Sequence, residues 1–291
     1  FKSEEFQQKK AEKEALKEDL TKPYVPSGAK YESPDSLEKF DEFMKGRQAS
    51  LMSDNGLTEE DVSILRKGFK QLFEDHEYGM RFKGEILTKI LNSHFMNQME
   101  SGTSKGWHNE FGRAKVSRDL FGHDYELDKV GVTGNGGYYE KYGYMPDDPI
   151  KAVSGDYTAD WYGDMVATFR KDRVESRTTF TCGDSLGGSS SSSYAAGRAG
   201  KDPGWEGATY AGVSTVLNRF KAAMASGKKL KPSDIVGHGY LELQYHGRLT
   251  FDDVDALYMT KSAAAAHLSE KTKQRLKDKG VRIYVHGEGW I

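Results

Sequence analysis

The chain has 291 residues and a nearly balanced charge: 42 lysines and arginines against 44 aspartates and glutamates leave a formal net charge of -2. A single cysteine excludes an intrachain disulfide and the cysteine clusters of structural zinc or iron–sulfur sites. The balanced charge argues against a broad nucleic-acid-binding surface, and the lack of a long apolar run predicts no membrane-spanning helix and no membrane partner.

The first 34 residues are predicted to hold a solvated helix followed by a linker. Residues 2–20 are mostly charged helix formers with few large apolar side chains, too few for a core face. A contact with upstream sequence is the alternative. Prolines and a glycine in residues 21–34 break regular structure. Because the chain begins at Phe1 without a signal sequence, we expect a processed or excised piece of a longer polypeptide.

Residues 35–97 are predicted to form a small helical subdomain of three amphipathic helices. Ser33-Pro34 has the pattern of a helix start, and Thr58 followed by acidic residues has the pattern of a capped first turn. The third helix is expected over about 82–95. The apolar residues of all three repeat at helical spacing, which indicates core packing rather than a ligand site.

The chain changes character near residue 98, where an α+β domain is predicted to begin and to continue to residue 291. Only six of the 32 glycines lie in the first 100 residues, and glycine marks turns and weakens helices. Short strands with scattered helices after this point indicate an α+β fold. Strands are predicted at 165–170, 177–181, 240–245, 256–259 and 281–286, and helices at 209–225 and 270–278.

The segment YLELQYHG at 240–247 has the clearest functional pattern. Alternate side chains of a strand share a face, so Leu241, Leu243 and Tyr245 are predicted to face a core. Glu242 and Gln244 would then face the other way. Two interpretations stay open: a polar site at the mouth of a glycine-rich loop, or an exposed strand face with both side chains in water.

Two further segments have weaker functional patterns. Thr179 and Thr181 place two hydroxyls on one strand face, although threonine is favoured in strands for packing as well. The turn SGTSKG at 101–106 offers backbone N–H groups to a phosphate, although many surface turns have this composition. Cys182 is predicted to pack inside the fold, and the scattered histidines indicate no metal site.

Taken in chain order, these segments resemble the mono-ADP-ribosyltransferase superfamily, and more narrowly an uncharacterised bacterial family assigned to it. The resemblance covers roughly residues 98–286 and has no counterpart in residues 1–95. The matching text is SGTSKG at 101–106, Arg113 followed by LFGHDY at 120–125, KYGYM at 141–145, RTTFTCGDS at 177–185 and YLELQYHGRLTFDDVDAL at 240–257. The last two blocks are the more specific ones.

The resemblance implies a split, two-sheet α+β core that grips NAD in a cleft. It also implies that an early block binds the dinucleotide, that a hydroxyl of a middle strand positions the catalytic glutamate, and that Glu242 is this glutamate. The flat ring of Tyr142 would stack on nicotinamide. The residues expected to bind or position NAD are Ser101, Gly102, Thr103, Ser104, Arg113, Tyr142, Thr179 and Thr181.

The sequence departs from the superfamily pattern at two places. Ser101 stands where an arginine or histidine usually grips NAD, and Arg113 is the expected substitute. The late block reads Glu-x-Gln, so the catalytic set is Glu242 and Gln244. If Gln244 occupied the catalytic position, the domain would be inactive. We favour Glu242, because several members of the superfamily use one glutamate followed by a non-acidic residue.

The resemblance therefore implies an NAD-dependent mono-ADP-ribosyltransferase that releases nicotinamide and transfers ADP-ribose to a macromolecule. The acceptor stays open, and the near-neutral charge favours a protein over nucleic acid. We expect a bacterial toxin or effector domain, secreted or delivered into the cytoplasm of a target cell, with an upstream carrier or an immunity protein as a further partner. The alternatives are a non-catalytic structural or binding module, as in a phage or delivery particle, and an NAD glycohydrolase.

Overall fold

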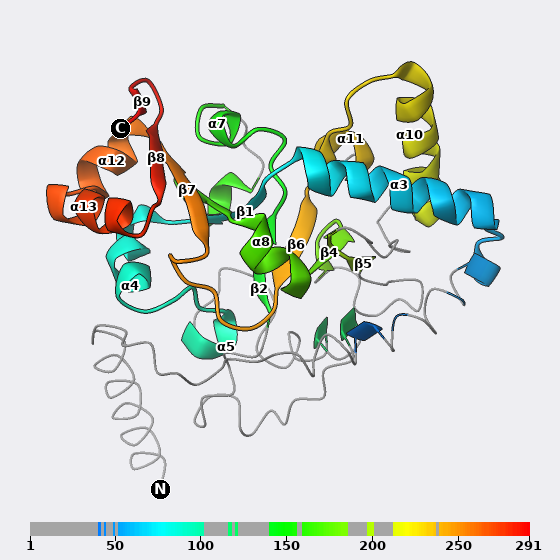
Figure 1. Cartoon of the computed structure of the whole chain (residues 1–291), viewed down its shortest axis with the longest axis horizontal. Coiled ribbons are helices and arrows are strands. Elements are labelled where there is room, and N and C mark those ends of the chain that lie inside the picture. The colour runs from blue at the N-terminus through cyan, green and yellow to red at the C-terminus, as the bar shows by residue number, and fades with distance from the viewer. Residues whose placement is uncertain are drawn as a thin grey trace, which may run out of the picture.

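The protein has an α+β fold built on one mixed sheet (Figure 1). The computed structural model describes residues 40, 41, 44, 49, 52–101, 116, 117, 120, 121, 140–155, 159–185, 197–200, 212–236 and 239–291. The helix and linker predicted for residues 1–34 lie outside this set. The strands are β1 (Tyr78–Phe82), β2 (Lys141–Tyr144), β3 (Met165–Phe169), β4 (Thr178–Cys182), β5 (Gly197–Arg198), β6 (Leu241–Tyr245), β7 (Val254–Met259), β8 (Arg282–Val285) and β9 (Gly289–Trp290).

The described strands form a single nine-stranded sheet in the order β5-β4-β6-β2-β1-β3-β7-β8-β9. Neighbours are antiparallel except for β7 and β8, which are parallel. The prediction of two sheets is therefore corrected to one. The sheet has two parts, β5-β4-β6-β2 and β1-β3-β7-β8-β9. They meet between β2 and β1, where only the pair Gly79↔Tyr144 is in register. By comparison, β2 pairs with β6 over four residues and β1 pairs with β3 over five.

Glycines explain why the two parts can meet so closely. A Cβ atom on Gly143 would lie 2.2 Å from the carbonyl oxygen of Gly79, closer than real Cβ atoms approach any atom. The hydroxyl of Tyr245 in β6 donates to the same Gly79 oxygen over 3.0 Å, which ties the two parts together across β2. The absence of a side chain at residue 143 is thus a requirement of the sheet.

Helices cover the sheet at both ends (Figure 1). None of the described helices is long and apolar enough to cross a membrane. The helices whose bounds the structure describes are α3 (Glu59–Asp75), α4 (Leu87–Asn92), α5 (Gln98–Ser101), α7 (Pro149–Ala152), α8 (Lys171–Val174), α10 (Val213–Ser226), α11 (Pro232–Val236), α12 (Lys261–His267) and α13 (Glu270–Asp278), with 3-10 turns η1 (Gly84–Ile86), η4 (Asp160–Tyr162) and η5 (Glu175–Arg177).

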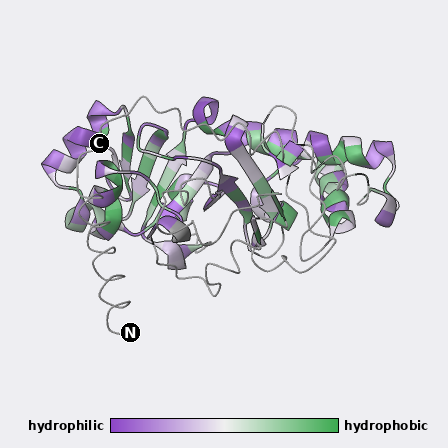
Figure 2. Cartoon of the chain, turned by 90° about the horizontal axis from the view of Figure 1, so that it is seen from below, coloured by the Kyte–Doolittle hydropathy of each residue, from purple (hydrophilic) through white to green (hydrophobic). Residues whose placement is uncertain are grey.

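Helix α3 begins where its sequence predicts. Thr58 and Asp61 form a capping box, in which each side chain accepts a hydrogen bond from the backbone N–H of the other residue. The predicted apolar stripe is buried, and Phe69 packs with ring centroids 4.6 Å from Phe180 of β4 and 5.0 Å from Phe220 of α10. Figure 2 shows hydrophobic and hydrophilic residues alternating along the helices at this end. Amphipathic helices thus cover β4, which carries part of the candidate site.

Residues 35–97 differ from the predicted helical subdomain. The helix predicted over 82–95 is replaced by the end of β1, the turn η1 and the short helix α4. Strand β1 lies in the middle of the sheet, and one continuous core runs from Phe40 to Val285. The physical reason is tertiary, since β1 is paired along one whole side with β3 and crosses β2 on the other. The described residues of this region therefore share one sheet and one core with the described residues of the rest of the chain.

The five predicted strands are confirmed as β3, β4, β6, β7 and β8, with ends that differ by one or two residues. The predicted helix 270–278 is confirmed as α13 with the same bounds. Helix α10 ends at Ser226, and Gly227 follows it in the left-handed conformation, as expected for a glycine after a helix.

Candidate active site

Three neighbouring strands bring the polar residues of the predicted site onto one face. The register pairs Gln244 of β6 with Thr179 of β4 on one side and with Tyr142 of β2 on the other. Glu242 is flanked in the same way by Thr181 and Tyr144. Side chains directly opposite each other in a sheet share a face. The structure therefore brings together the sequence blocks around 142, 179 and 242, which are far apart in the chain.

This face is buried. Glu242 is 2% exposed, and Gln244, Thr179 and Thr181 are each 0% exposed. The interpretation of an exposed strand face in water is therefore wrong. Leu241, Leu243 and Tyr245 belong to the main core, as predicted, and Cys182 is buried among it. Buried polar groups require hydrogen-bond partners, so the contacts of Glu242 and Gln244 define what the site can do.

The side chain of Gln244 uses its amide fully. Its Nε2 donates to Thr181 Oγ1 and to Glu242 Oε1, both over 2.9 Å. Its Oε1 accepts from Thr179 Oγ1 over 2.9 Å. Both amide hydrogens are therefore committed, and one of them is held on the carboxyl of Glu242. Gln244, which the sequence places in the catalytic set with Glu242, thus contacts the carboxyl of Glu242 directly.

Glu242 itself lies within β6 and also contacts the segment that follows β4. Its Oε1 also accepts from the backbone N–H of Ser185, which follows β4, over 3.3 Å. Burial and the nearby negative charge of Asp184 raise the pKa of Glu242 from the ordinary 4.5 to about 8, although the hydrogen bonds from Ser185 and Gln244 act in the opposite direction. A carboxyl with so high a pKa, on a polar face inside the fold, is typical of a functional site.

The raised pKa predicts that the folded protein loses stability as the pH rises from about 5 to about 8. The unfolded carboxyl ionises near 4.5, whereas the folded one keeps its proton up to about pH 8. The folded state therefore binds more protons in this window, so the free energy of unfolding decreases there, by at most about 4 kcal/mol. Glu242→Gln cannot ionise and should remove this dependence. Urea denaturation of both proteins at several pH values measures it; a difference between them that is constant with pH would contradict the assignment.

Tyr142 lies on the candidate face, but its hydroxyl has a partner that sequence reasoning missed. It donates to Glu140 Oε1 over 3.0 Å, and Ser117 Oγ donates to the same oxygen. Glu140 is 2% exposed. The sequence contained a signal for this partner: residues 140, 142 and 144 alternate with Lys141 and Gly143, and alternate residues of an extended segment share a face. The face therefore holds two buried carboxyl groups, those of Glu140 and Glu242.

The early block is described only up to its first residue. Ser101 ends α5, and its backbone N–H donates to Asn97 O over 3.0 Å. The other predicted NAD-binding residues of this block, Gly102, Thr103, Ser104 and Arg113, lie outside the described residues.

An ion-pair network joins α5 to β2. Glu100, the neighbour of Ser101, pairs with His94 over 2.6 Å and with the buried Lys141 over 3.4 Å. Burial alone would raise the pKa of Glu100, but the hydrogen bond from His94 and the charge of Lys141 outweigh it and lower this pKa to about 2. The network fixes the end of α5 beside the strand that carries Tyr142.

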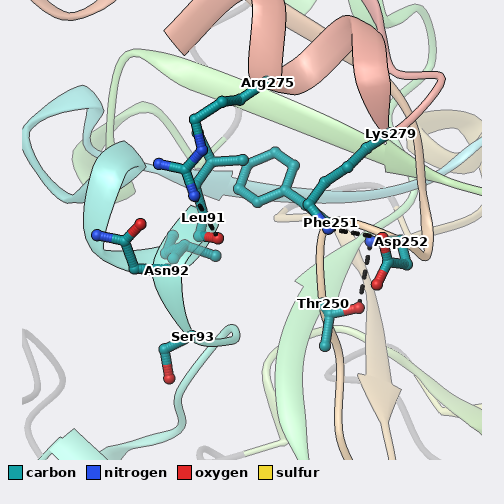
Figure 3. A pocket seen from close by; sticks show the side chains of 9 residues that line it. Leu91, Asn92, Ser93, Thr250, Phe251, Asp252, Arg275 and Lys279 are labelled. Carbon is teal, nitrogen blue, oxygen red and sulfur yellow. Dashed lines mark hydrogen bonds and ion pairs between the residues drawn. The ribbon is translucent and has the colours of Figure 1, made fainter. Parts of the chain in front are cut away.

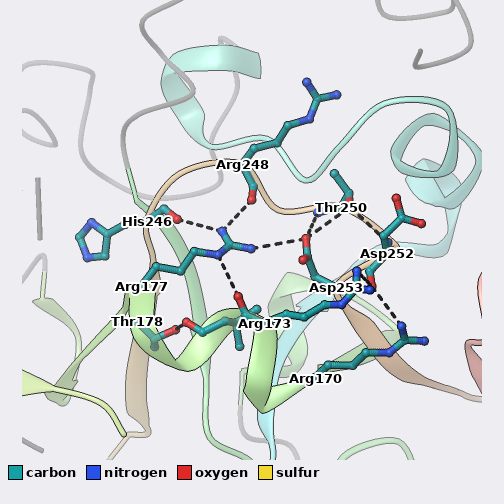
Figure 4. Close-up of polar contacts among 10 residues, drawn as sticks. Arg170, Arg173, Arg177, Thr178, His246, Arg248, Thr250, Asp252 and Asp253 are labelled. Atoms are coloured by element: carbon teal, nitrogen blue, oxygen red, sulfur yellow. Dashed lines mark hydrogen bonds and ion pairs between the residues drawn. The ribbon is translucent and has the colours of Figure 1, made fainter. Parts of the chain in front are cut away.

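Arg177, just before β4, holds the turn that follows β6 (Figure 4). Its Nη1 donates to the carbonyl oxygens of His246 over 2.9 Å and Arg248 over 2.6 Å, and Nη2 pairs with Asp253 over 3.4 Å. Its Nε donates to Arg173 O over 3.3 Å. One planar guanidinium thus connects four groups and anchors both ends of the turn.

Arg177→Lys is expected to destabilise the protein by about 2 kcal/mol, because one ammonium group cannot reach all four acceptors in the same plane. Urea denaturation of the variant measures this loss. The control Arg66→Lys, at an exposed position of α3, should change the free energy of unfolding by less than about 0.5 kcal/mol. Equal stabilities of the two variants would show that the guanidinium contacts do not anchor the turn.

A separate pocket of about 140 Å³ lies between α4, the turn at 250–252 and α13 (Figure 3). Its cationic side chains are engaged: Arg275 donates to Leu91 O over 3.2 Å, and Lys279 pairs with Asp252 over 2.7 Å. None of the residues of the Glu242 face lines it. The pocket therefore does not belong to the candidate site.

Within the described part of the chain, no group of three or more histidine, cysteine, aspartate or glutamate side chains is placed to hold a metal ion. On the candidate face, the described polar groups are Glu242, with Gln244 and the two threonines around it, and the carboxyl of Glu140 beside Tyr142. No protein-family model matches the chain, and no curated protein is significantly similar to it.

Proposed function

We propose that this protein is an NAD-dependent mono-ADP-ribosyltransferase, with Glu242 as its catalytic residue. The observation that carries the proposal is the buried Glu242 carboxyl, which is held by Gln244 and Ser185 on a polar strand face next to two threonine hydroxyls. The order of the blocks in the sequence resembles this superfamily, and the sheet register brings three of those blocks onto one face. The register argument does not depend on the early block, of which the structure describes only Ser101.

The chemistry assigns each group a role. The bond between the ribose C1′ and the nicotinamide nitrogen breaks, and nicotinamide leaves as a neutral molecule with the bonding electrons. Glu242 accepts a hydrogen bond from the ribose 2′-hydroxyl and stabilises the positive charge that develops on the sugar. An acceptor nucleophile then bonds to C1′ and loses its proton to solvent. Tyr142, anchored through its hydroxyl to Glu140, is proposed to stack on nicotinamide.

Glu242 can take this role only in its ionised form, and its raised pKa means that this form needs a positive charge nearby. With a pKa of about 8, the carboxyl is largely protonated in the ligand-free protein at neutral pH. The positive nicotinamide ring of NAD would favour the ionised form on binding, since an opposite charge nearby lowers the pKa of a carboxyl. The substrate itself therefore generates the carboxylate that the reaction needs.

The test is incubation with NAD labelled on its adenine or ribose part, alone and with a whole-cell lysate. Released nicotinamide together with labelled protein supports the proposal, and the net charge of -2 favours protein over nucleic acid as acceptor. Nicotinamide without a labelled macromolecule would identify an NAD glycohydrolase. No nicotinamide at all would leave the fold as a non-catalytic structural or binding module.

The cellular context of this activity stays a proposal of the same kind. A bacterial toxin or effector would be secreted or delivered, would act in the cytoplasm of a target cell, and would be associated with a carrier or an immunity protein. The identity of the labelled acceptor in the lysate experiment is the first test of this context. A toxin would modify a defined protein of the target cell and no protein of the cell that produces it.

A further inference from the structure

His246 lies at the far end of a hydrogen-bonded chain that leads to Glu242. Its Nε2 is 2.9 Å from Thr179 Oγ1, and that hydroxyl is 2.9 Å from Gln244 Oε1. Gln244 Nε2 is in turn 2.9 Å from Glu242 Oε1. His246 is 0% exposed, as are Thr179 and Gln244. Residues 242, 244 and 246 alternate along one strand direction, which places all three on the same face.

The direction of each hydrogen bond in this chain is determined by a count of protons. A threonine hydroxyl has one proton to donate and two lone pairs. Thr179 gives its proton to Gln244 Oε1, because an amide oxygen cannot donate. The contact between Thr179 and His246 then requires a proton from the imidazole. His246 must therefore carry a hydrogen on Nε2.

The same count fixes the orientation of the Gln244 amide. The hydroxyl of Thr181 donates to Gly183 O over 2.9 Å, so Thr181 Oγ1 can only accept from Gln244. Thr179 donates on the opposite side of the amide. A rotated amide would turn Oε1 toward the carboxyl oxygen of Glu242, which repels it when the carboxyl is ionised. Two threonines thus select the orientation in which an N–H group contacts Glu242.

We propose that His246 is a positioning residue whose Nε2–H group orients Thr179 and, through it, holds the Gln244 N–H group on the Glu242 carboxyl. The ring is held in place on several sides. Its centroid lies 5.2 Å from that of Phe121 in an edge-to-face contact, and its backbone N–H and C=O both bond to Arg177. The effect of His246 on catalysis rests on the proposed function, whereas its effect on the hydrogen bonds does not.

The first test is the tautomer of His246 in the ligand-free protein. Long-range ¹H–¹⁵N NMR spectra distinguish a protonated from an unprotonated ring nitrogen, and His246→Gln identifies the signals by their loss. We expect the hydrogen on Nε2. A ring with its hydrogen only on Nδ1 would overturn the inference, because Thr179 would then have to donate to His246 and could not donate to Gln244.

The second test is the titration midpoint of Glu242, measured by NMR on protein with ¹³C-labelled glutamate carboxyls and identified with Glu242→Gln. His246→Phe keeps a flat ring without a donor, and Thr179→Val interrupts the chain at the next position. His246→Phe removes the donor that orients the Thr179 hydroxyl, and Thr179→Val removes the donor to Gln244 Oε1. Each change loosens the amide on the side opposite Glu242 while Thr181 still holds the other side, so both should weaken the N–H contact to Glu242 and move the midpoint upward by about one pH unit. His246→Gln retains an N–H donor and should stay within about 0.3 of the unsubstituted protein.

Unchanged midpoints in His246→Phe and Thr179→Val would overturn the proposal. An equal rise of the midpoint in His246→Gln and His246→Phe would also overturn it, because the rise would then come from the lost packing of the ring and not from the lost N–H donor. Neither NMR test needs turnover, so a protein that fails to cleave NAD would refute the proposed function while leaving this inference standing. If NAD is cleaved, His246→Phe should lower kcat about tenfold with KM unchanged, whereas His246→Gln should keep the kcat of the unsubstituted protein.

Discussion

Glu242→Gln is expected to lower the rate of nicotinamide release from NAD by about 10²–10³-fold, and Glu242→Ala by at least as much. Glutamine has the size of the original side chain but carries no charge for the cation-like sugar. Its amide oxygen can still accept the two hydrogen bonds that Gln244 and Ser185 donate to Oε1. The variant should therefore stay folded, so that the lost rate reports the lost carboxylate.

Two controls separate this loss from damage to the fold. Glu270→Gln removes a carboxylate that is 88% exposed on α13 and should leave turnover unchanged. Urea denaturation of Glu242→Gln at neutral pH should show a free energy of unfolding no lower than that of the unsubstituted protein, since the ionisable buried group is gone. Unchanged nicotinamide release in the folded Glu242→Gln variant would remove Glu242 from catalysis and end the proposal.

The pH profile provides an independent reading of the same group. If ionised Glu242 is the active form, kcat/KM should rise with pH and level off above about 8, because this parameter reports the pKa of the free enzyme. The plateau of kcat, which reports the pKa in the bound complex, should be reached at a lower pH, since the positive charge of NAD favours the carboxylate form of Glu242. A kcat/KM that is constant between about pH 6 and pH 9 would contradict this assignment.

Gly143→Ala is expected to destabilise the protein by more than about 3 kcal/mol, the upper end of what overpacking costs. The new Cβ would lie 2.2 Å from Gly79 O and 2.6 Å from the ring of Tyr245. The first of these is a backbone atom of β1, so the clash is relieved only by moving the two parts of the sheet apart. Gly143 also lies between Tyr142 and Tyr144, so this movement would disturb the candidate site.

The control for this prediction is Gly287→Ala. That glycine has a φ of +85° and open space where the new methyl group would lie, so it should lose only about 1 kcal/mol through backbone strain. Thermal and urea denaturation of the two variants give the comparison. If Gly143→Ala were no less stable than Gly287→Ala, the close crossing of β1 and β2 would not be a feature of the folded protein in solution.

Much of the local structure was predictable because local rules govern it. The Thr58 cap, the bounds of α13 and the glycine after α10 follow from hydrogen bonds and backbone freedom within a few residues. Strand β1 was not predictable in this way. It is short, it contains Gly79, and what makes it a strand is its pairing with β3 and β2 from distant parts of the chain.

The candidate site divides along the same line. Alternation along 240–245 correctly predicted that Glu242 and Gln244 share a face opposite to the core residues of β6, because strand geometry has a period of two. The partners of that face came from register, which no local pattern specifies. Glu140 and His246, which directly flank β2 and β6, were missed for this reason, although each lies an even number of positions along the chain from Tyr142 or Glu242.

By itself, the sequence determined an α+β chain with amphipathic helices and a strand that presents a glutamate and a glutamine on one side. Only the tertiary structure decided that this side is buried and that Gln244 has both amide hydrogens in use, one of them on Glu242. The reason is physical. The polarity of a side chain states what it must bond to, but whether water or two threonines of another strand provide the bonds depends on which strands become neighbours.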